Sequence, residues 1–256
     1  MMKTILLVFA FVSCVAAQNP ALQKDRQVLL DFRIDRNPSN VRIPAATERT
    51  VLSKVFRRYL TDSNRCNPDI DTSKGTDPLA EARKAGQIVP SILDMTTGSF
   101  TAANQTQTLY VISVTECNAS HADNFGTKRV AIFSGQQLVA DVDADFASNI
   151  VRKTDLNSDG IDELLMTTSD MSQGTVTEMA TLVSFQGGRR RVIHDFGSVV
   201  EDSCAAEATY STSDASVLYI SDAGLGNMPK ITQENYNASC RGKVRRWKLV
   251  SRPKRK

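Results

Sequence analysis

The sequence predicts a mainly β protein built of blade-like antiparallel meanders, with one N-terminal amphipathic helix. Three observations predict this fold class. Short apolar segments separated by turn residues fill the chain after Gly98, they recur as triplets at a spacing of about fifty residues, and helical periodicity is confined to one earlier segment. A closed propeller has about four to eight blades. Two good triplets and one weaker triplet therefore favour a partial or degenerate β-propeller or a sandwich-like stack.

The N-terminus has the pattern of a secretory signal peptide. Lys3 precedes an apolar run from Ile5 to Val12, and small residues lead up to Ala17. We expect residues 1–17 to be removed after Ala17 and the protein to be secreted or periplasmic. An alternative is a lipoprotein modified at Cys14, although Phe11 fits the lipid-attachment motif poorly. No later stretch has the length of a transmembrane helix.

Four of the five cysteines follow the signal peptide. An even number in an oxidising compartment predicts two disulfides. Proximity in the sequence favours Cys66 with Cys117 and Cys204 with Cys240, although four cysteines allow three pairings. The net charge of +3 indicates no strongly charged partner for the chain as a whole.

Residues 18–98 form a mixed N-terminal region. Within it, Val28–Ile34 has strand character, and apolar residues recur at helical spacing over about residues 47–60, with Thr47 placed to cap the helix. The apolar positions of this helix are Val51, Leu52, Val55, Phe56, Tyr59 and Leu60. Residues 61–80 are rich in turn formers and predict a loop around Cys66. We expect the helix to cover an open sheet edge, which would otherwise invite strand addition.

Residues 99–250 form the predicted β domain. The first triplet of strands spans Gln107–Val114, Lys128–Phe133 and Gln137–Val142, and the second spans Asp162–Thr168, Glu178–Phe185 and Arg190–Phe196. A weaker third triplet spans Ser216–Ile220, Lys230–Glu234 and Val244–Val250. Leu109 corresponds to Leu164, and Ile132 to Val183, so we interpret the triplets as repeated units.

An acidic segment opens the second triplet. Oxygen ligands alternate at Asp155, Asn157 and Asp159, Gly160 permits a sharp turn, the carbonyl of Ile161 can contribute, and Glu163 can complete the shell. All-oxygen ligands at this spacing predict Ca²⁺ as the cofactor. An EF-hand is excluded because Met166 stands where a bidentate glutamate is expected. An ordinary exposed acidic turn is the alternative.

The run Asp155-Leu-Asn-Ser-Asp-Gly-Ile-Asp-Glu-Leu-Leu165 resembles the start of an FG-GAP or VCBS repeat, and the likeness extends to Phe196. The resemblance implies a propeller-type blade and calcium held by residues matching Asp155, Asn157, Asp159, Ile161 and Glu163. Such repeats occur in adhesins, integrin-like ectodomains, polysaccharide-binding proteins and some enzymes. The first triplet lacks the acidic loop and has Ala103–Gln107 instead.

Catalytic signals are weak. His194 is expected to pair with a neighbouring carboxylate, and His121 lies near Cys117, which is better explained as half of a disulfide. No common hydrolase, zinc-protease or phosphate-loop motif occurs, so we assign no catalytic residue. The leading hypothesis is a calcium-binding module for a protein or glycan ligand. The alternative is an exported hydrolase of glycans or peptides that uses acids such as Asp141, Asp143 or Glu116.

The C-terminus is basic. Arg241–Lys256 contains nine lysines or arginines and no acid, and residues 251–256 form a basic tail. A solvated terminus is the simplest interpretation, with contact to anionic envelope polymers as an alternative and nucleic acid not expected as a partner. Asn104, Asn118 and Asn237 each begin a glycosylation triplet, which would be used only in a eukaryotic secretory pathway.

Overall fold

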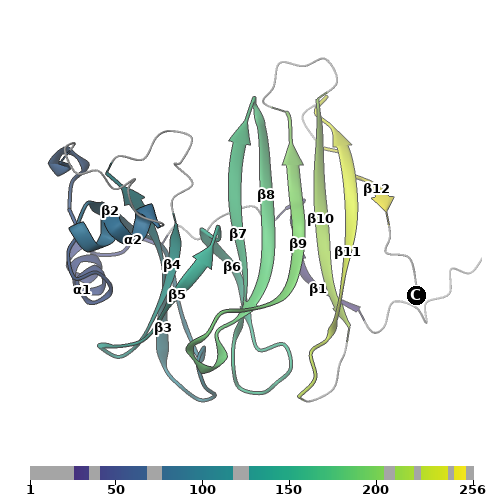
Figure 1. Ribbon diagram of the computed structural model, residues 1–256. Coiled ribbons are helices and arrows are strands. Elements are labelled where there is room, and N and C mark those ends of the chain that lie inside the picture. Colours follow the sequence, from purple (N-terminus) through teal and green to yellow (C-terminus); the bar gives the residue numbers. More distant parts are fainter. Residues whose placement is uncertain are drawn as a thin grey trace, which may run out of the picture.

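The computed structural model describes residues 26–34, 41–67, 77–117, 127–204, 211–221, 226–241 and 245–251. The expected signal peptide at 1–17 with Cys14, the residues Asn118 and His121, and residues 252–256 of the basic tail lie outside the described residues. Within the described part, antiparallel strands in two sheets dominate (Figure 1). The predicted fold class, mainly β with antiparallel meanders, is confirmed.

The smaller sheet has four antiparallel strands in the order β2-β3-β4-β5. They are β2 (Ile88–Gly98), β3 (Gln107–Glu116), β4 (Lys128–Ser134) and β5 (Gln137–Asp145). Both faces of β3 and β4 are buried, which explains why their sequences are continuous apolar runs rather than alternating patterns.

The larger sheet has eight strands, seven of them in the order β12-β11-β10-β9-β8-β7-β6, and β1 pairs with β10. Its strands are β1 (Arg26–Asp31), β6 (Asn149–Thr154), β7 (Glu163–Ser172), β8 (Thr175–Ser184), β9 (Arg191–Asp202), β10 (Thr212–Ser221), β11 (Lys230–Ser239) and β12 (Lys248–Ser251). β9 pairs with β10 over Ser213–Ala215, and β1 pairs with the rest of β10 from Val217 to Ser221. β1 therefore pairs with the part of β10 that β9 does not reach. The segment Val28–Ile34, which has strand character in the sequence, thus contributes to a strand of the larger sheet.

Two α-helices precede most of the strands. α1 (Ala45–Val55) and α2 (Pro78–Ala85) contribute apolar side chains to a core with one face of the smaller sheet. The predicted helix is thus confirmed, but it covers a sheet face rather than an edge. It also ends earlier than expected: Phe56 is extended, and the Leu60 N–H donates to the Ile88 carbonyl 2.8 Å away. This tertiary hydrogen bond keeps Leu60 out of the helix despite its helical spacing.

The ends of the helices differ from the prediction. Thr47 lies inside the first turn of α1, whose N-cap is Pro44 without a side-chain cap. α2 falls partly in the segment predicted as a loop. Asp77 caps it by accepting a 3.0 Å hydrogen bond from the Ala80 N–H, Pro78 is its first residue, and Gly86 ends it in the left-handed conformation at φ 73°. Proline at the start and glycine after the end are known helix signals, so this helix could have been predicted.

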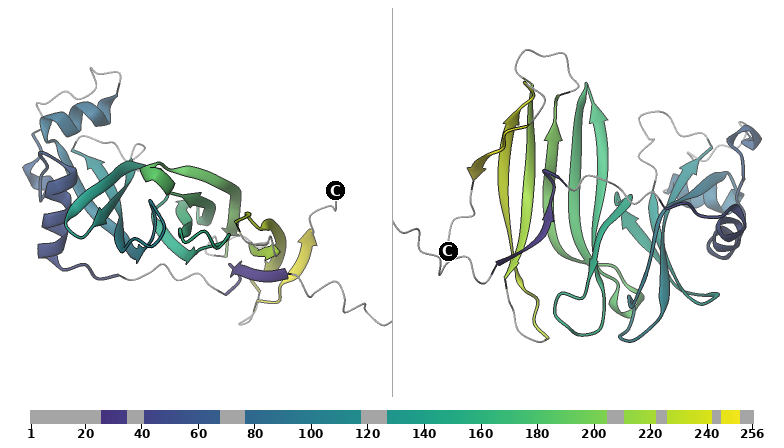
Figure 2. Two further views of the ribbon diagram at one scale, coloured as in Figure 1. Left: turned by 90° about the horizontal axis from the view of Figure 1, so that it is seen from below. Right: turned by 180° about the vertical axis from the view of Figure 1, so that it is seen from behind.

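The smaller sheet lies between the helices and the β6–β8 part of the larger sheet (Figure 2). Alternate residues of β3 face the two cores: Leu109 packs toward the larger sheet, and Tyr110 packs toward the helices. The buried Asp94, at a bulge in β2, accepts a 2.7 Å hydrogen bond from the Ile150 N–H of β6. Core packing and this polar link together hold the two sheets face to face, as a sandwich-like stack requires.

All nine strands of the three predicted triplets are present in the expected order. The three triplets are not three separate blades, however. The second and third belong to one sheet, because β9 pairs with β10, whereas the first forms a sheet with β2. The strand-rich region also begins at Ile88 rather than after Gly98. The grouping depends on which strands form backbone hydrogen bonds with each other, and this pairing produces no periodic pattern in the sequence.

Both disulfides are present with the pairing that sequence proximity favours. Cys66 is bonded to Cys117, and Cys204 is bonded to Cys240. The first joins the segment between the helices to the end of β3, and the second joins the end of β9 to the end of β11. Two such cross-links are compatible with an extracellular or periplasmic location.

Candidate functional site

The acidic loop connects β6 to β7. Thr154 and Glu163 lie opposite each other at the base of this hairpin, so the loop residues 155–162 extend beyond the last strand pair. Two residues in it have positive φ, Ser158 at 59° and Gly160 at 82°. A side chain at Gly160 would also place its Cβ 3.0 Å from the Cβ of Ala103. Glycine is thus required there both by the turn and by the close approach of the neighbouring chain.

Backbone N–H groups of the loop hold its carboxylates. The two oxygens of Asp155 accept hydrogen bonds from the N–H groups of Asp159, at 3.1 Å, and Gly160, at 2.9 Å. Asp159 accepts from the Ile161 N–H at 2.9 Å and from the Asn157 side-chain amide at 3.1 Å. Three of the predicted ligand side chains are therefore already gathered within one tight turn.

Glu163 is the buried member of the group. It is 1% exposed, and its carboxylate accepts a hydrogen bond from the Leu156 N–H at 2.9 Å. The pKa of Glu163 is raised to about 7, chiefly by burial and in addition by the negative charges of Asp159 and Asp155. A buried acid next to two other acids is a site where a cation would be stabilised.

The loop is fastened to the smaller sheet and to a distant turn. Asp162 and Ser99 exchange two hydrogen bonds, from the Asp162 N–H to the Ser99 carbonyl at 2.7 Å and from the Ser99 N–H to Asp162 Oδ2 at 2.8 Å. The Asn157 carbonyl accepts from the Gly226 N–H at 2.7 Å. Asp162 therefore has a structural role, because it links the loop to the chain that follows β2.

The carboxylates of the loop are near one another, but their oxygens do not form a group compact enough to share one ion as they stand. In the described part of the chain, Asp202, Cys204 and Cys240 are the one group of three or more acidic, histidine or cysteine side chains whose ligand atoms all lie within 4.8 Å. Both cysteines of that group are in a disulfide, so it offers no thiolate. For Asp155, Asp159 and Glu163 to share an ion, their oxygens would have to move inward. The oxygen-only donor set and the buried charge of Glu163 fit Ca²⁺.

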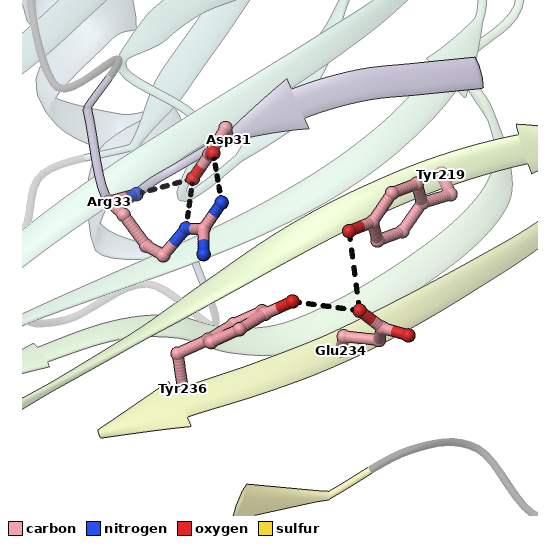
Figure 3. A network of polar contacts seen from close by, with 5 residues as sticks. All are labelled: Asp31, Arg33, Tyr219, Glu234 and Tyr236. Atoms are coloured by element: carbon pink, nitrogen blue, oxygen red, sulfur yellow. Dashed lines mark hydrogen bonds and ion pairs between the residues drawn. The ribbon is translucent and has the colours of Figure 1, made fainter. Parts of the chain in front are cut away.

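A second polar cluster joins β1 to β10 and β11 (Figure 3). Glu234 accepts hydrogen bonds on Oε2 from the hydroxyls of Tyr219, at 3.2 Å, and Tyr236, at 2.9 Å, and pairs with Arg26 through Oε1 at 3.1 Å. The Arg26 guanidinium lies 3.6 Å from the centre of the Tyr219 ring. These partners are up to 208 residues apart, and sequence reasoning missed the cluster because no local signal marks it.

Arg33 closes the cluster on its other side. Its guanidinium makes hydrogen bonds of 2.8 and 2.6 Å to the two carboxylate oxygens of Asp31 and lies 4.2 Å from the centre of the Tyr236 ring. Burial alone would raise the pKa of Glu234, but hydrogen bonds from Tyr236 and Arg26 outweigh it, and the pKa is lowered. The acids of this cluster are paired with its own arginines and tyrosine hydroxyls. We therefore interpret it as a structural cluster that holds β1 against β10 and β11.

The candidate hydrolytic acids lie on two strands of the smaller sheet, Asp141 and Asp143 on β5 and Glu116 at the end of β3. Asp141 pairs with Arg129 at 2.7 Å, and Asp143 accepts from the Asp145 N–H at 2.6 Å. The register places Asp141 across β4 from Tyr110, and Glu116 is six residues further along β3. That offset corresponds to about 20 Å at ~3.3 Å per residue. Glu116 therefore lies far from Asp141, whereas Asp141 and Asp143 are alternate residues of β5.

The two histidines contribute no catalytic geometry to the described part of the chain. His194 stacks against Phe196, with ring centroids 4.5 Å apart. The carboxylate of the adjacent Asp195 accepts instead from the Gly197 N–H. The described residues include no hydrogen bond or ion pair between His194 and a carboxylate, and His194 and Asp195, as successive strand residues, point to opposite faces. His121 lies outside the described residues, and its suggested partner Cys117 is in a disulfide.

Comparison with known proteins adds no relative. No protein-family model, curated protein or solved structure matches this chain. The resemblance to FG-GAP and VCBS repeats thus stays a prediction from the acidic segment. In the described segments, no helix has the length and apolar content needed to cross a membrane.

Proposed function

We propose that this protein is a secreted or periplasmic calcium-binding β module that acts as a binding or interaction protein. The ion would be held by the side chains of Asp155, Asn157, Asp159 and Glu163 and by the carbonyl of Ile161. The observation that carries the proposal is Glu163, a 1% exposed acid with a raised pKa beside two further acids. A divalent cation would replace this repulsion by attraction.

The position of the loop indicates what calcium would do. Asp162 binds the β2–β3 connection of the smaller sheet, and Asn157 binds Gly226 beyond β10 of the larger sheet. An ion held between Asp155 and Glu163 would stiffen a loop that fastens both sheets. We therefore assign calcium a structural role in presenting the surface of the module, and we assign its ligand to the class of proteins or glycans that the repeat resemblance implies.

Isothermal titration calorimetry of the purified protein with CaCl₂ tests the metal site. We expect one ion to bind per chain and Asp159→Asn and Glu163→Gln each to weaken binding at least ten-fold, since each removes one negatively charged ligand. Asp170→Asn is the matched control, because Asp170 lies on β7 seven residues beyond Glu163, about 23 Å at ~3.3 Å per residue. Absence of heat from the wild-type protein would refute the metal site.

The interaction role needs a separate test. Glycan-array and secreted-protein binding measurements with the calcium-loaded protein, repeated with chelator, are expected to show a ligand whose binding weakens when calcium is removed. Calcium uptake without any calcium-dependent ligand would leave the metal site intact and overturn the interaction role.

A further inference from the structure

A hollow lies between α1 and the smaller sheet, remote in sequence from the acidic loop. It encloses about 300 Å³, the lower end of the ~300–1,000 Å³ typical of small-molecule sites. One wall is the face of α1 that carries residues at helical spacing, and the other is β3, β4 and the turn before β5. The lining residues are Ala46, Thr47, Thr50, Val51, Lys54, Tyr110, Phe133, Gly135 and Gln136.

Tyr110 contributes an aromatic ring and a polar group to the lining of the hollow. Its side chain is 7% exposed and packs edge to face on Phe133, with ring centroids 5.7 Å apart. No hydrogen bond of the Tyr110 hydroxyl is found among the described residues. Tyr110 lines the hollow, and a buried tyrosine hydroxyl usually finds a hydrogen-bond partner, which a ligand in the hollow could supply.

Lys54 supplies the charge. Its ammonium donates a hydrogen bond to the Gln136 carbonyl across one end of the hollow, which leaves further N–H donors on the same nitrogen. Lys54 is the one charged residue in the lining. The remaining surface is largely apolar, from Ala46, Val51 and Phe133. An occupant with a flat apolar body and one negative charge matches this combination.

We propose that the hollow between α1 and the smaller sheet binds a small aromatic carboxylate, whose ring packs on Val51 and Phe133 and whose carboxylate is recognised by Lys54 and the Tyr110 hydroxyl. This assignment is independent of calcium, because none of the lining residues belongs to the acidic loop. It gives the module a small-molecule site in addition to its proposed interaction role.

Ligand-observed ¹⁹F NMR with 4-fluorophenylacetate tests the proposal on the full protein. A probe of this size is expected to bind with a dissociation constant in the millimolar range or below. Tyr110→Phe keeps the ring and removes only the hydroxyl, so it should preserve the fold and weaken binding about five-fold. Lys54→Gln should weaken binding to a similar extent, and Thr50→Trp should block the hollow from the exposed side of α1.

Two controls define the chemistry. Lys84→Gln, on the exposed face of α2, should leave binding unchanged, and 4-fluorophenylacetamide, which has the same shape without the charge, should bind at least five-fold more weakly. The proposal is overturned if 10 mM 4-fluorophenylacetate, roughly ten times a millimolar dissociation constant, shows no binding. It is equally overturned if Tyr110→Phe, Lys54→Gln and Thr50→Trp all bind like the wild type, or if the amide binds as well as the acid.

Discussion

Two glutamates of the larger sheet are almost equally buried and respond in opposite ways. Glu163, at the start of β7, is 1% exposed and has a pKa raised to about 7, whereas Glu234, on β11, is 6% exposed and has a lowered pKa. Burial disfavours the charge in both. Glu234 accepts hydrogen bonds from two tyrosine hydroxyls and from Arg26. Glu163 accepts hydrogen bonds from the backbone N–H groups of Leu156 and Glu163 and lies near the negative charges of Asp159 and Asp155.

We call the cluster around Glu234 closed, because its charges are compensated within the protein. We call the cluster around Glu163 open, because its negative charges are not compensated. The cluster of Glu234 supplies its own counter-charges, so it stabilises the fold without any ligand. The cluster of Glu163 has excess negative charge and would gain most from an external cation. Burial of a carboxylate is therefore not in itself a sign of function, whereas burial without a matched positive charge is a reason to test for a metal.

The largest expected effect is that of calcium on stability. Calcium at about 100 times its dissociation constant should stabilise the folded protein by about 2.7 kcal/mol, which corresponds to a rise in Tm of about 5–10 °C for a chain of this size. Thermal melts followed by circular dichroism, with CaCl₂ and with EDTA at pH 7.5, measure it. Glu163→Gln should remove most of the shift, and equal melting temperatures in both buffers would contradict the open cluster.

Removal of charge from the closed cluster should be destabilising with or without calcium. Glu234→Gln should lower the free energy of unfolding by about 2 kcal/mol at pH 7, because Arg26 and two hydroxyls lose a charged acceptor. Urea unfolding measures this, and Glu201→Gln on the exposed side of β9 should change it by less than about 0.5 kcal/mol.

The pH dependence of this effect has a definite sign. The lowered pKa of Glu234 means that its stabilisation is present above the unfolded-state pKa of about 4.3 and is lost as the pH falls through the folded-state value. The gap between wild type and Glu234→Gln should therefore narrow in acid. A gap that widened below pH 4 would contradict the assignment of the charged form to the cluster.

Glu163 should show the reverse behaviour in calcium-free protein. Its folded-state pKa of about 7 lies above the unfolded value, so the calcium-free protein should lose stability as the pH rises from about 4.3 to 7. Glu163→Gln should thus stabilise the calcium-free protein at pH 8 by about 1–2 kcal/mol. Urea unfolding in EDTA at pH 5 and pH 8 measures this, and a destabilised variant at pH 8 would mean that Glu163 is already compensated by the protein.

The smallest expected effect concerns the contacts of Arg33 with Asp31 and Tyr236 at the end of β1. Arg33→Lys keeps the charge but loses the two-pronged hydrogen bonding to Asp31 and the stacking on Tyr236, so it should destabilise the protein by about 0.5–1 kcal/mol. Hydrogen exchange should show the loss as faster exchange of the β1 amides. Unchanged exchange in β1 would show that main-chain pairing alone holds this strand.

Local patterns predicted much of this molecule. The strands of the three triplets follow from runs of apolar residues between turn formers, and the pairing of the cysteines follows from the entropy of closing the shorter loops. The helix α2 was missed although Pro78 and Gly86 mark its ends. The predicted α1 was too long because Tyr59 and Leu60 continue its spacing, whereas the helix ends before Phe56, whose backbone is extended.

The sequence by itself determined the elements and the acidic loop, because dihedral preferences, turn residues and ligand spacing act over a few neighbouring positions. Only the tertiary structure decided which strands share a sheet, that β1 pairs with β10, that Glu234 meets Arg26 across 208 residues, and that Tyr110 borders a hollow under α1. These contacts depend on free energies gained between segments distant in the chain, which leave no local pattern to read.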